Sequence, residues 1–302
     1  MRRYRLYQVD AFTQQKFRGN PAGVVPDAQG LDVVQMQAIA REMNCSETAF
    51  IFPSQGPGYD IVLRYFTPTA EVPGCGHATI AAHYIRAKEL GLVVGTRVRT
   101  LTRSGILPVE ITWEHGDYKI LLIQGRPEFG RLLQEDERRT LLRALGLRYE
   151  ETLLENYPVQ IVSLGQARIL LGIRSRSTLN RLAPDIETLH NLSKRLGCHG
   201  CFVFTFDPEV SEILTWGRMF APAMGISEDP VSGNAHGPLG AYLVRHRLVP
   251  VEGDGFHFTG YQGEVLRRWG QVDVFVYHPA GVLDWVQVGG HAVTVFQAEI
   301  TL

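Results

Sequence analysis

The sequence contains two short glycine turns whose residue types suit the binding of a small acid. The first, in EVPGCGHATIAAHYI, includes Gly76 and His77, and the second, in EDPVSGNAHGPLGAYLV, includes Gly233 and Asn234. Each turn leads into a run of small apolar residues that is typical of a buried helix. A helix N-terminus presents unpaired N–H groups and a partial positive charge, and a preceding glycine lets a ligand approach them. Each turn is therefore a candidate site for a carboxylate or an oxyanion.

The candidate acid and base side chains are not shared equally between the two turns. Glu47 lies in CSETAF, whereas the matching stretch CHGCFV has Gly200 at that position. In the first half, Asp229 aligns either with Glu71 or with no residue. A carboxyl group in an apolar cleft can have its pKa raised toward neutrality, as general acid–base chemistry requires. We therefore expect one main carboxylate to move a proton, the alternatives being a surface role for Glu47 and a simple turn role for Asp229.

Two further pairs differ between the turns. Cys75 is matched by Ser232, and His77 is matched by Asn234. His77 could instead cap a helix or lie in the core, and Cys75 could be a small buried residue. The remaining candidate histidines show no ligand spacing, so we predict no metal site; they are His83, His190, His236 and His246.

Both turns belong to an internal duplication, which defines the elements that must position them. LDVVQMQAIAREMNCSETAFIF aligns with PDIETLHNLSKRLGCHGCFVF at an offset of 153 residues, and the offset grows to 157 at the glycine turns. Each half predicts strands, a helix capped by Asp32 or Asp185, and a second, apolar helix after the turn. That helix has few polar positions in its first turns, so we expect a sheet to surround it.

The predicted fold is α+β, with two pseudo-symmetric domains that each wrap a curved sheet around a central helix. We expect the first domain to span residues 1–125, joined by a C-terminal strand at 288–302, and the second to span 126–287.

The composition restricts the possible partners. With 30 Lys and Arg against 31 Asp and Glu, the formal net charge is −1, which argues against nucleic-acid and membrane-surface partners. The N-terminus lacks the apolar core of a signal peptide, and no apolar run approaches the ~20 residues that span a bilayer. Four cysteines in 302 residues favour a cytoplasmic setting. Cys198 and Cys201 form a C-x-x-C motif. We interpret them as two half-buried thiols near a strand, in preference to a redox site or a zinc site.

The motifs SETAFI, RYFTPTAEVPGCGHATIAAHYI and EDPVSGNAHGPLGAYLV, after VDAFTQQKFRGNPAGVV near the start, resemble the PhzF-like family. That family is named for the phenazine-biosynthesis isomerase and shares the diaminopimelate-epimerase fold. The resemblance implies two barrel-like domains, an active site between them, no metal and no organic cofactor. It also implies a homodimer.

The resemblance also assigns roles to residues. It makes Glu47 the catalytic glutamate, with Asp229 as an active-site aspartate. It matches Gly76, His77 and Gly233 to active-site positions of the family. The phenazine enzyme has a serine where this chain has Asn234, so the substrate can differ. Asn20, in RGNPAGV, is a further candidate for contacting the ligand.

The leading hypothesis is a cofactor-independent isomerase of a small carboxylic acid. Glu47 would take a proton from carbon and return it elsewhere. Asp229 and His77 would be catalytic too: they would position substrate and supply the second proton-transfer or hydrogen-bonding group. The turns would hold the carboxylate or the developing negative charge. One alternative is a Cys75-dependent epimerase or racemase of an amino acid. Ser232 stands where such enzymes place a second cysteine, and an unactivated hydroxyl is a poor base. The other alternative is a non-catalytic protein that binds small acids.

Overall fold

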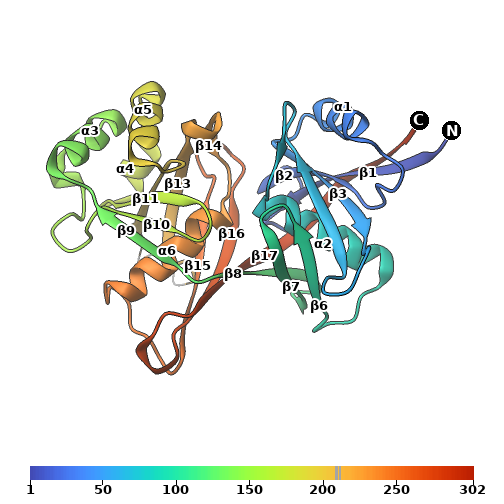
Figure 1. Ribbon diagram of the computed structural model, residues 1–302. Coiled ribbons are helices and arrows are strands. Elements are labelled where there is room, and N and C mark those ends of the chain that lie inside the picture. Colours follow the sequence, from blue (N-terminus) through green and yellow to red (C-terminus); the bar gives the residue numbers. More distant parts are fainter. Residues whose placement is uncertain (208–209, 211) are drawn as a thin grey trace. The chain divides into compact units, whose positions relative to one another are not determined.

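The computed structural model describes residues 1–207, 210 and 212–302, and the chain divides into two compact units (Figure 1). Unit 1 consists of Met1–Ile123 and Gly289–Leu302, and unit 2 consists of Gln124–Val288. Strands β8 and β17 carry the chain from one unit into the other. Each unit combines a curved sheet with a central helix, which confirms the predicted α+β class.

The elements from the N-terminus to β8 are β1 (Arg3–Ala11), β2 (Asn20–Val25), α1 (Val33–Met43), β3 (Glu47–Pro53), β4 (Ile61–Phe66), β5 (Glu71–Val72), α2 (Gly76–Leu90), β6 (Arg97–Thr102), β7 (Gly105–Glu114) and β8 (Asp117–Gly125). The elements that follow are β9 (Glu128–Leu132), α3 (Glu135–Leu145), η1 (Tyr149–Glu151), β10 (Gln160–Ser163), β11 (Ala167–Gly172), α4 (Arg176–Arg181), α5 (Ile186–Leu196), β12 (Cys201–Phe206), β13 (Thr215–Ala221), η2 (Pro222–Met224), β14 (Ile226–Asp229), α6 (Gly233–Arg245), β15 (Gly255–Gln262), β16 (Gly270–Tyr277), η3 (Pro279–Gly281) and β17 (Trp285–Thr301).

The sheet of unit 1 closes into a barrel. Its strands pair in the order β17–β1–β2–β3–β4–β6–β7–β8, and β8 pairs with β17 again, which makes eight strands in a ring. The pairs β2–β3 and β4–β6 are parallel. In unit 2 the corresponding pairs β11–β12 and β13–β15 are parallel too, while β12–β13 and β15–β16 are antiparallel, as are β3–β4 and β6–β7. The internal duplication seen in the sequence is thus repeated in the order and direction of strand pairing.

The central helices are α2 in unit 1 and α6 in unit 2. Every residue of α2 from His77 to Ile85 is buried, and α6 is buried from Ala235 to Val244. Small residues make this possible because the sheet approaches the helix closely. A Cβ at Gly240 would lie 2.8 Å from a methyl carbon of Val274, closer than real side chains pack. The prediction of an apolar helix inside each sheet is confirmed.

The peripheral helices begin where the sequence predicts. An Asp32 carboxylate oxygen accepts from the Gln35 amide at 2.8 Å at the start of α1, and Asp185 accepts from the Thr188 amide at 3.0 Å at the start of α5. Both aspartates therefore act as helix N-caps.

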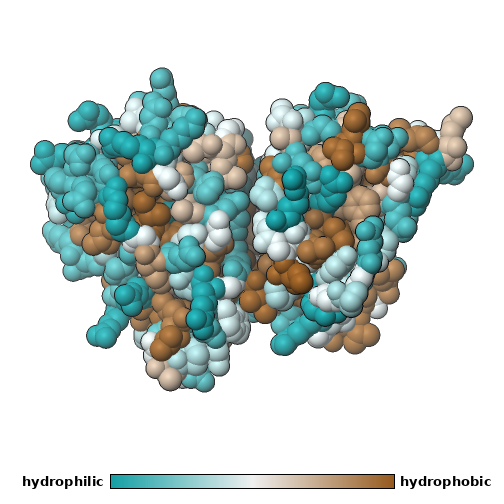
Figure 2. Space-filling model, in the orientation of Figure 1, coloured by the Kyte–Doolittle hydropathy of each residue, from teal (hydrophilic) through white to brown (hydrophobic). Residues whose placement is uncertain are grey.

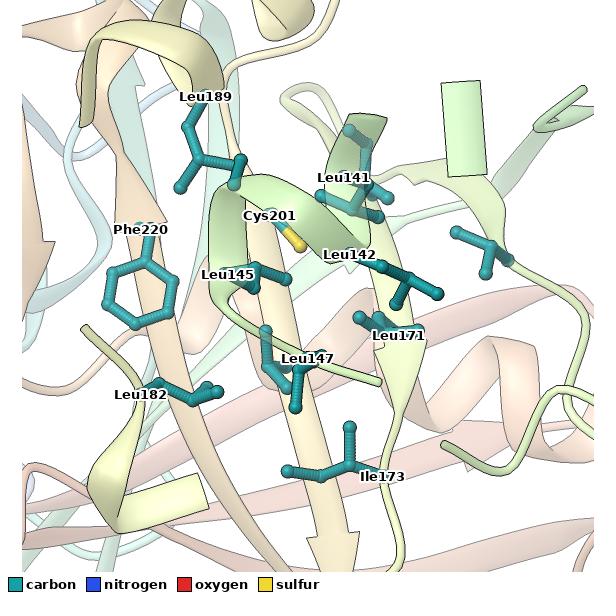
Figure 3. Close-up of a cluster of buried hydrophobic side chains, with 14 of the residues drawn as sticks. Leu141, Leu142, Leu145, Leu147, Leu171, Ile173, Leu182, Leu189, Cys201 and Phe220 are labelled. Carbon is teal, nitrogen blue, oxygen red and sulfur yellow. The ribbon is translucent and has the colours of Figure 1, made fainter. Parts of the chain in front are cut away.

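A second layer in unit 2 covers the outside of its sheet. Helices α3 and α5 pack together and bury leucines against strands β11 to β13, as Figure 3 shows for Leu141, Leu145, Leu171 and Leu189. In the view of Figure 2, hydrophilic residues cover much of the surface of each unit, with hydrophobic residues between them. Among the described helices, none is long and apolar enough to span a membrane.

An arginine–glutamate pair is repeated at the strand that leads into each central helix. In unit 1, Arg64 donates to both carboxylate oxygens of Glu71 at 2.8 Å. In unit 2, Arg218 donates to both oxygens of Glu228 at 2.9 and 2.8 Å. Bidentate pairs of this kind fix orientation as well as adding energy. Each pair therefore holds the short strand β5 or β14, just before the glycine turn, against the neighbouring strand.

We expect R218M to lower the free energy of unfolding by about 3–5 kcal/mol, because it leaves the Glu228 carboxylate buried without its cation. The side chains of Arg218 and Glu228 are only 6% and 12% exposed. Urea unfolding followed by circular dichroism measures the loss. R99M is the control, because Arg99 and its partner Asp60 are exposed and the pair should contribute far less. Equal losses in the two variants would contradict a special role for the buried pair.

Candidate functional site

The turn of unit 1 is held by a chain of hydrogen bonds from inside the barrel. Cys75 is the N-cap residue of α2, and its side chain makes no capping hydrogen bond. The Thr79 hydroxyl donates to the Cys75 carbonyl at 2.6 Å and accepts from the Tyr65 hydroxyl at 2.7 Å. Burial raises the pKa of Tyr65, so its phenol stays a neutral donor. The backbone of the turn is thus fixed, while the Cys75 thiol remains partly exposed.

Three of the predicted site residues meet at this turn. The His77 Nε2 atom lies 3.3 Å from Oε2 of Glu47, and His77 Nδ1 lies 3.4 Å from Sγ of Cys75. The Ser46 hydroxyl lies 3.2 Å from the same Nε2 atom. The imidazole ring of His77 therefore stands between a carboxylate and a thiol.

The Glu47 carboxylate is largely buried. Its side chain is 11% exposed, and Oε2 has no hydrogen-bond partner in the part of the chain that the structure describes. Its distance from His77 Nε2 is short, but the contact lacks hydrogen-bond geometry. A buried carboxylate oxygen with an unused lone pair can accept a proton from a bound substrate.

The same three side chains could also hold a metal ion. Glu47, Cys75 and His77 each offer one donor atom, and these atoms lie within 4.8 Å of one another. Carboxylate, thiolate and imidazole are all zinc ligands. Ligand spacing is not visible here in the sequence because the glutamate comes from a different element.

Asn20 lies on the strand next to that of Glu47. It is the first residue of β2 and is fully buried. Two residues further along, Ala22 pairs with Glu47 across the parallel β2–β3 ladder. Because alternate residues share one face of a strand, the side chains of Asn20 and Glu47 lie on the same face of the sheet.

The turn of unit 2 is held differently. Ser232 is the N-cap of α6, and its amide donates to the Gln262 side chain at 3.2 Å, while Gln262 donates to the Asp229 carbonyl at 2.6 Å. Burial lowers the pKa of His236 to about 4. His236 is therefore neutral, and its Nδ1–H donates to the Ser232 carbonyl at 3.0 Å, as Thr79 does to its N-cap carbonyl in unit 1.

The Asn234 side chain is fixed by two glutamines. Gln124 Nε2 donates to Asn234 Oδ1 at 2.6 Å, and Asn234 Nδ2 donates to Gln166 Oε1 at 3.4 Å. A Cβ at Gly237 would lie 2.3 Å from Gln124 Oε1, so the glycine one turn along α6 leaves room for this contact. Where unit 1 has a titratable imidazole, unit 2 has an amide in a hydrogen-bond network.

The repeated ion pairs settle the relation of Asp229 to the first half. Arg218 corresponds to Arg64, so Glu228, not Asp229, is the counterpart of Glu71. Asp229 then corresponds to Val72, and its carboxylate has no equivalent in unit 1. Asp229 ends β14, and its partner in β13 is Met219.

The C-x-x-C residues are not half-buried as the sequence suggested. Cys198 is 5% exposed and Cys201 is 1% exposed, and Cys201 lies in the apolar cluster of Figure 3. Burial raises the pKa of both thiols, which makes them poor nucleophiles and metal ligands. The prediction was wrong because it did not include the layer of helices, α3 and α5, that covers this strand.

Unit 1 brings together Glu47, Cys75, Gly76 and His77, and it places Asn20 on the same face of the sheet as Glu47. In unit 2, the predicted residues Asp229, Ser232, Gly233 and Asn234 lie at the end of β14 and the start of α6. Sequence reasoning missed Ser46, Gln124 and Gln166. Ser46 stands beside Glu47 in a quoted motif, but the two glutamines become visible only through strand register.

Comparisons with known proteins show the family and the fold of this chain. The sequence profile of the family described as "Phenazine biosynthesis-like protein" matches residues 9–298. A protein from Clostridium acetobutylicum named "uncharacterized isomerase" is 51% identical over 302 residues, covering 100% of this chain and 99% of its own. The crystal structure of a Bacillus anthracis phenazine biosynthesis protein of the PhzF family is similar with a TM-score of 0.89, 28% identity and full coverage of both chains. A hydroxyproline epimerase from Agrobacterium vitis shares the fold, with a TM-score of 0.64 at 12% identity, covering 100% of this chain and 93% of that one.

We expect iodoacetamide to label Cys75 in the native protein and to leave the other three cysteines unmodified. Cys75 is partly exposed beside His77, while Cys45, Cys198 and Cys201 are at most 5% exposed. Peptide mass spectrometry after timed labelling measures the result, with a urea-unfolded sample as the control in which all four react. H77N should slow labelling of Cys75, because the imidazole promotes thiolate formation. Equal labelling of Cys75 and Cys198 would contradict this assignment.

Proposed function

This chain belongs to the phenazine biosynthesis-like family and is an enzyme of the isomerase type, and on that premise we propose that it isomerises a small carboxylic acid by proton transfer through Glu47. The proposed reaction needs no cofactor, as the family resemblance implies. One observation carries the proposal: the buried Oε2 atom of Glu47 has no hydrogen-bond partner among the described residues and lies beside His77.

The proposed chemistry has two proton-transfer steps. In the first, a C–H bond next to an unsaturated or carbonyl group breaks, its electrons move into that group, and an O–H bond forms on Glu47. In the second, the O–H bond breaks and a C–H bond forms at another carbon of the same system. His77 Nε2 lies 3.3 Å from the carboxylate and can stabilise its charged form before the first step and after the second.

In each unit, the N-terminus of the central helix, α2 or α6, is a proposed site for negative charge on a substrate. Each central helix is at least 13 residues long and is capped by a residue without a side-chain capping bond, Cys75 or Ser232. The backbone N–H groups at Gly76 and Gly233 are the proposed donors, since they begin these helices. Asp229, Asn20 and Asn234 would set the position of the substrate.

A second candidate is an epimerase that uses Cys75, and one observation favours it. The Cys75 thiol lies 3.4 Å from His77 Nδ1, so the imidazole could take its proton. The second half offers Ser232 at the matching position, and Asn234 stands there in place of His77. The nearby His236 ring donates its Nδ1–H to the Ser232 carbonyl. An unactivated serine hydroxyl is a poor proton acceptor, which places this candidate second.

We also propose that the enzyme works as a homodimer in the cytoplasm. All four cysteines are free thiols, which suits a reducing compartment. The homodimer rests on the family resemblance, and size-exclusion chromatography with light scattering tests it directly.

We expect the wild-type protein in D₂O to incorporate deuterium into its substrate and E47Q to lose at least ~100-fold in rate, because the amide keeps the shape and removes the base. The panel would contain dihydro-hydroxyanthranilate and small amino and hydroxy acids, with mass spectrometry as the readout. E42Q is the matched control, since Glu42 is an exposed glutamate five residues earlier. Full exchange by E47Q would rule out the assignment, and loss in C75S with retention in E47Q would favour the epimerase.

A further inference from the structure

The two halves differ in charge at the position of the catalytic carboxylate. In unit 1, Ala22 of β2 pairs with Glu47 of β3. In unit 2, Ile169 of β11 pairs with Cys201 of β12, and the Ile169 amide donates to the Gly200 carbonyl at 2.9 Å. One residue earlier in this register, Arg168 stands opposite Gly200. Arg168 and Gly200 are therefore the counterparts of Ala22 and Glu47.

Gly200 has no space for a replacement carboxylate. A Cβ at this position would lie 2.0 Å from the Phe220 carbonyl oxygen, a distance that real side chains do not show. The face of the sheet that carries a carboxylate in unit 1 therefore carries a guanidinium in unit 2, and this guanidinium comes from the neighbouring strand. Unit 1 offers a proton acceptor, and unit 2 offers a permanent cation.

The Arg168 guanidinium is buried with too few partners for its charge. The residue is 3% exposed, and its described hydrogen bonds go to Gln166 Oε1 at 2.6 Å, the Ala167 carbonyl at 3.3 Å and the Met224 sulfur at 3.8 Å. Its Nε atom has no hydrogen-bond partner among the described residues. Among the described residues, no carboxylate oxygen lies within 4.0 Å of its guanidinium nitrogens as an ion-pair partner.

Burial lowers the pKa of Arg168 to about 10, and the Asp229 carboxylate acts in the opposite direction. The guanidinium is therefore charged at neutral pH, and its charge is only partly balanced from a distance. Arg218, the other arginine of unit 2 that is at most 5% exposed, shows the contrast: it binds both oxygens of Glu228 and two backbone carbonyls. A buried cation without a close counter-ion is costly, so it calls for an anion.

The guanidinium is connected to the first turn of α6. Gln166 Oε1, which accepts from Arg168 Nη2, also accepts from Asn234 Nδ2 at 3.4 Å. Asn234 is the second residue of α6, a helix of 13 residues whose N-terminus adds positive potential. Met224 contacts Nη2 and is itself 39% exposed, so a flexible side chain separates the guanidinium from solvent.

We propose that Arg168, with the first turn of α6, forms a carboxylate-binding subsite in unit 2. The occupant is the carboxylate group of the substrate, which would accept from Arg168 Nε and from the backbone N–H groups of α6 once the Met224 side chain moves. This deepens the proposed function and rests on it. In the proposed function Glu47 transfers the proton, and Arg168 would restrict the substrates to carboxylic acids. Gln166 and Asn234 are positioning residues that orient the guanidinium and the turn.

The test uses sodium acetate as the probe and thermal unfolding as the readout, with sodium chloride at equal ionic strength as the reference. We expect acetate to raise the melting temperature of the wild type by a few degrees more than chloride. R168M should lose that shift and, in chloride, should melt at or above the wild-type temperature, because a poorly compensated buried charge has been removed.

R218M is the matched control. It removes another buried arginine of the same unit, and it should melt lower while keeping the acetate shift. R168M that melts well below wild type and keeps the shift would overturn the proposal, because Arg168 would then be structural. A wild type without an acetate shift would overturn it as well.

E47Q separates this proposal from the proposed function. Acetate binding needs no turnover, so E47Q should keep the wild-type acetate shift while losing proton exchange. If E47Q stays active but R168M loses the shift, the subsite stands and the assignment of the base fails. Once a substrate is known, R168K should raise KM with a smaller effect on kcat, since a point charge replaces a planar fork.

Discussion

The constraint on which this structure depends is the burial of a whole helix inside each sheet. A helix surrounded by strands can carry little polar surface, so its chemistry is confined to the N-cap and first turn. The strand that enters this turn must then be held firmly, and each half does so with a bidentate arginine–glutamate pair, Arg64–Glu71 or Arg218–Glu228. The pairs are repeated because the mechanical requirement is the same in both halves. The residues just beyond them differ because their chemical tasks differ.

Much of the fold could be predicted from the sequence because its signals are local. The caps Asp32 and Asp185, the small-residue runs of α2 and α6 and the repeat offsets are all visible in short stretches. Local signals were not enough to predict the cluster of Glu47, Cys75 and His77, since Glu47 begins a strand that is separate from the turn. The family resemblance supplied that link, while spacing alone left a surface role for Glu47 open.

The parts that the sequence could not predict depend on register between distant strands. Arg168 looks like an ordinary strand arginine until β11 is aligned with β12, which places it opposite Gly200. The same is true of Gln166, which no motif marks. The relation of Asp229 to Glu71 was ambiguous because an insertion allowed two alignments, and only the Arg218–Glu228 contact decides between them. The C-x-x-C thiols were misjudged because burial there comes from helices elsewhere in the chain.

The asymmetry between the halves also bears on stereochemistry. Inversion at carbon by two bases requires a titratable group at each turn, on opposite faces of the substrate. At the matched positions, unit 2 has Ser232 for Cys75, Asn234 for His77 and Gly200 for Glu47, so three groups that could exchange a proton have been replaced. Asp229 is the exception, and its carboxylate stands outside the repeat. A single carboxylate would return a proton to the face from which it took it, so the proposed reaction is isomerisation on one face and not racemisation. Under these proposals the duplicated turn has two different uses, proton transfer in one half and charge recognition in the other.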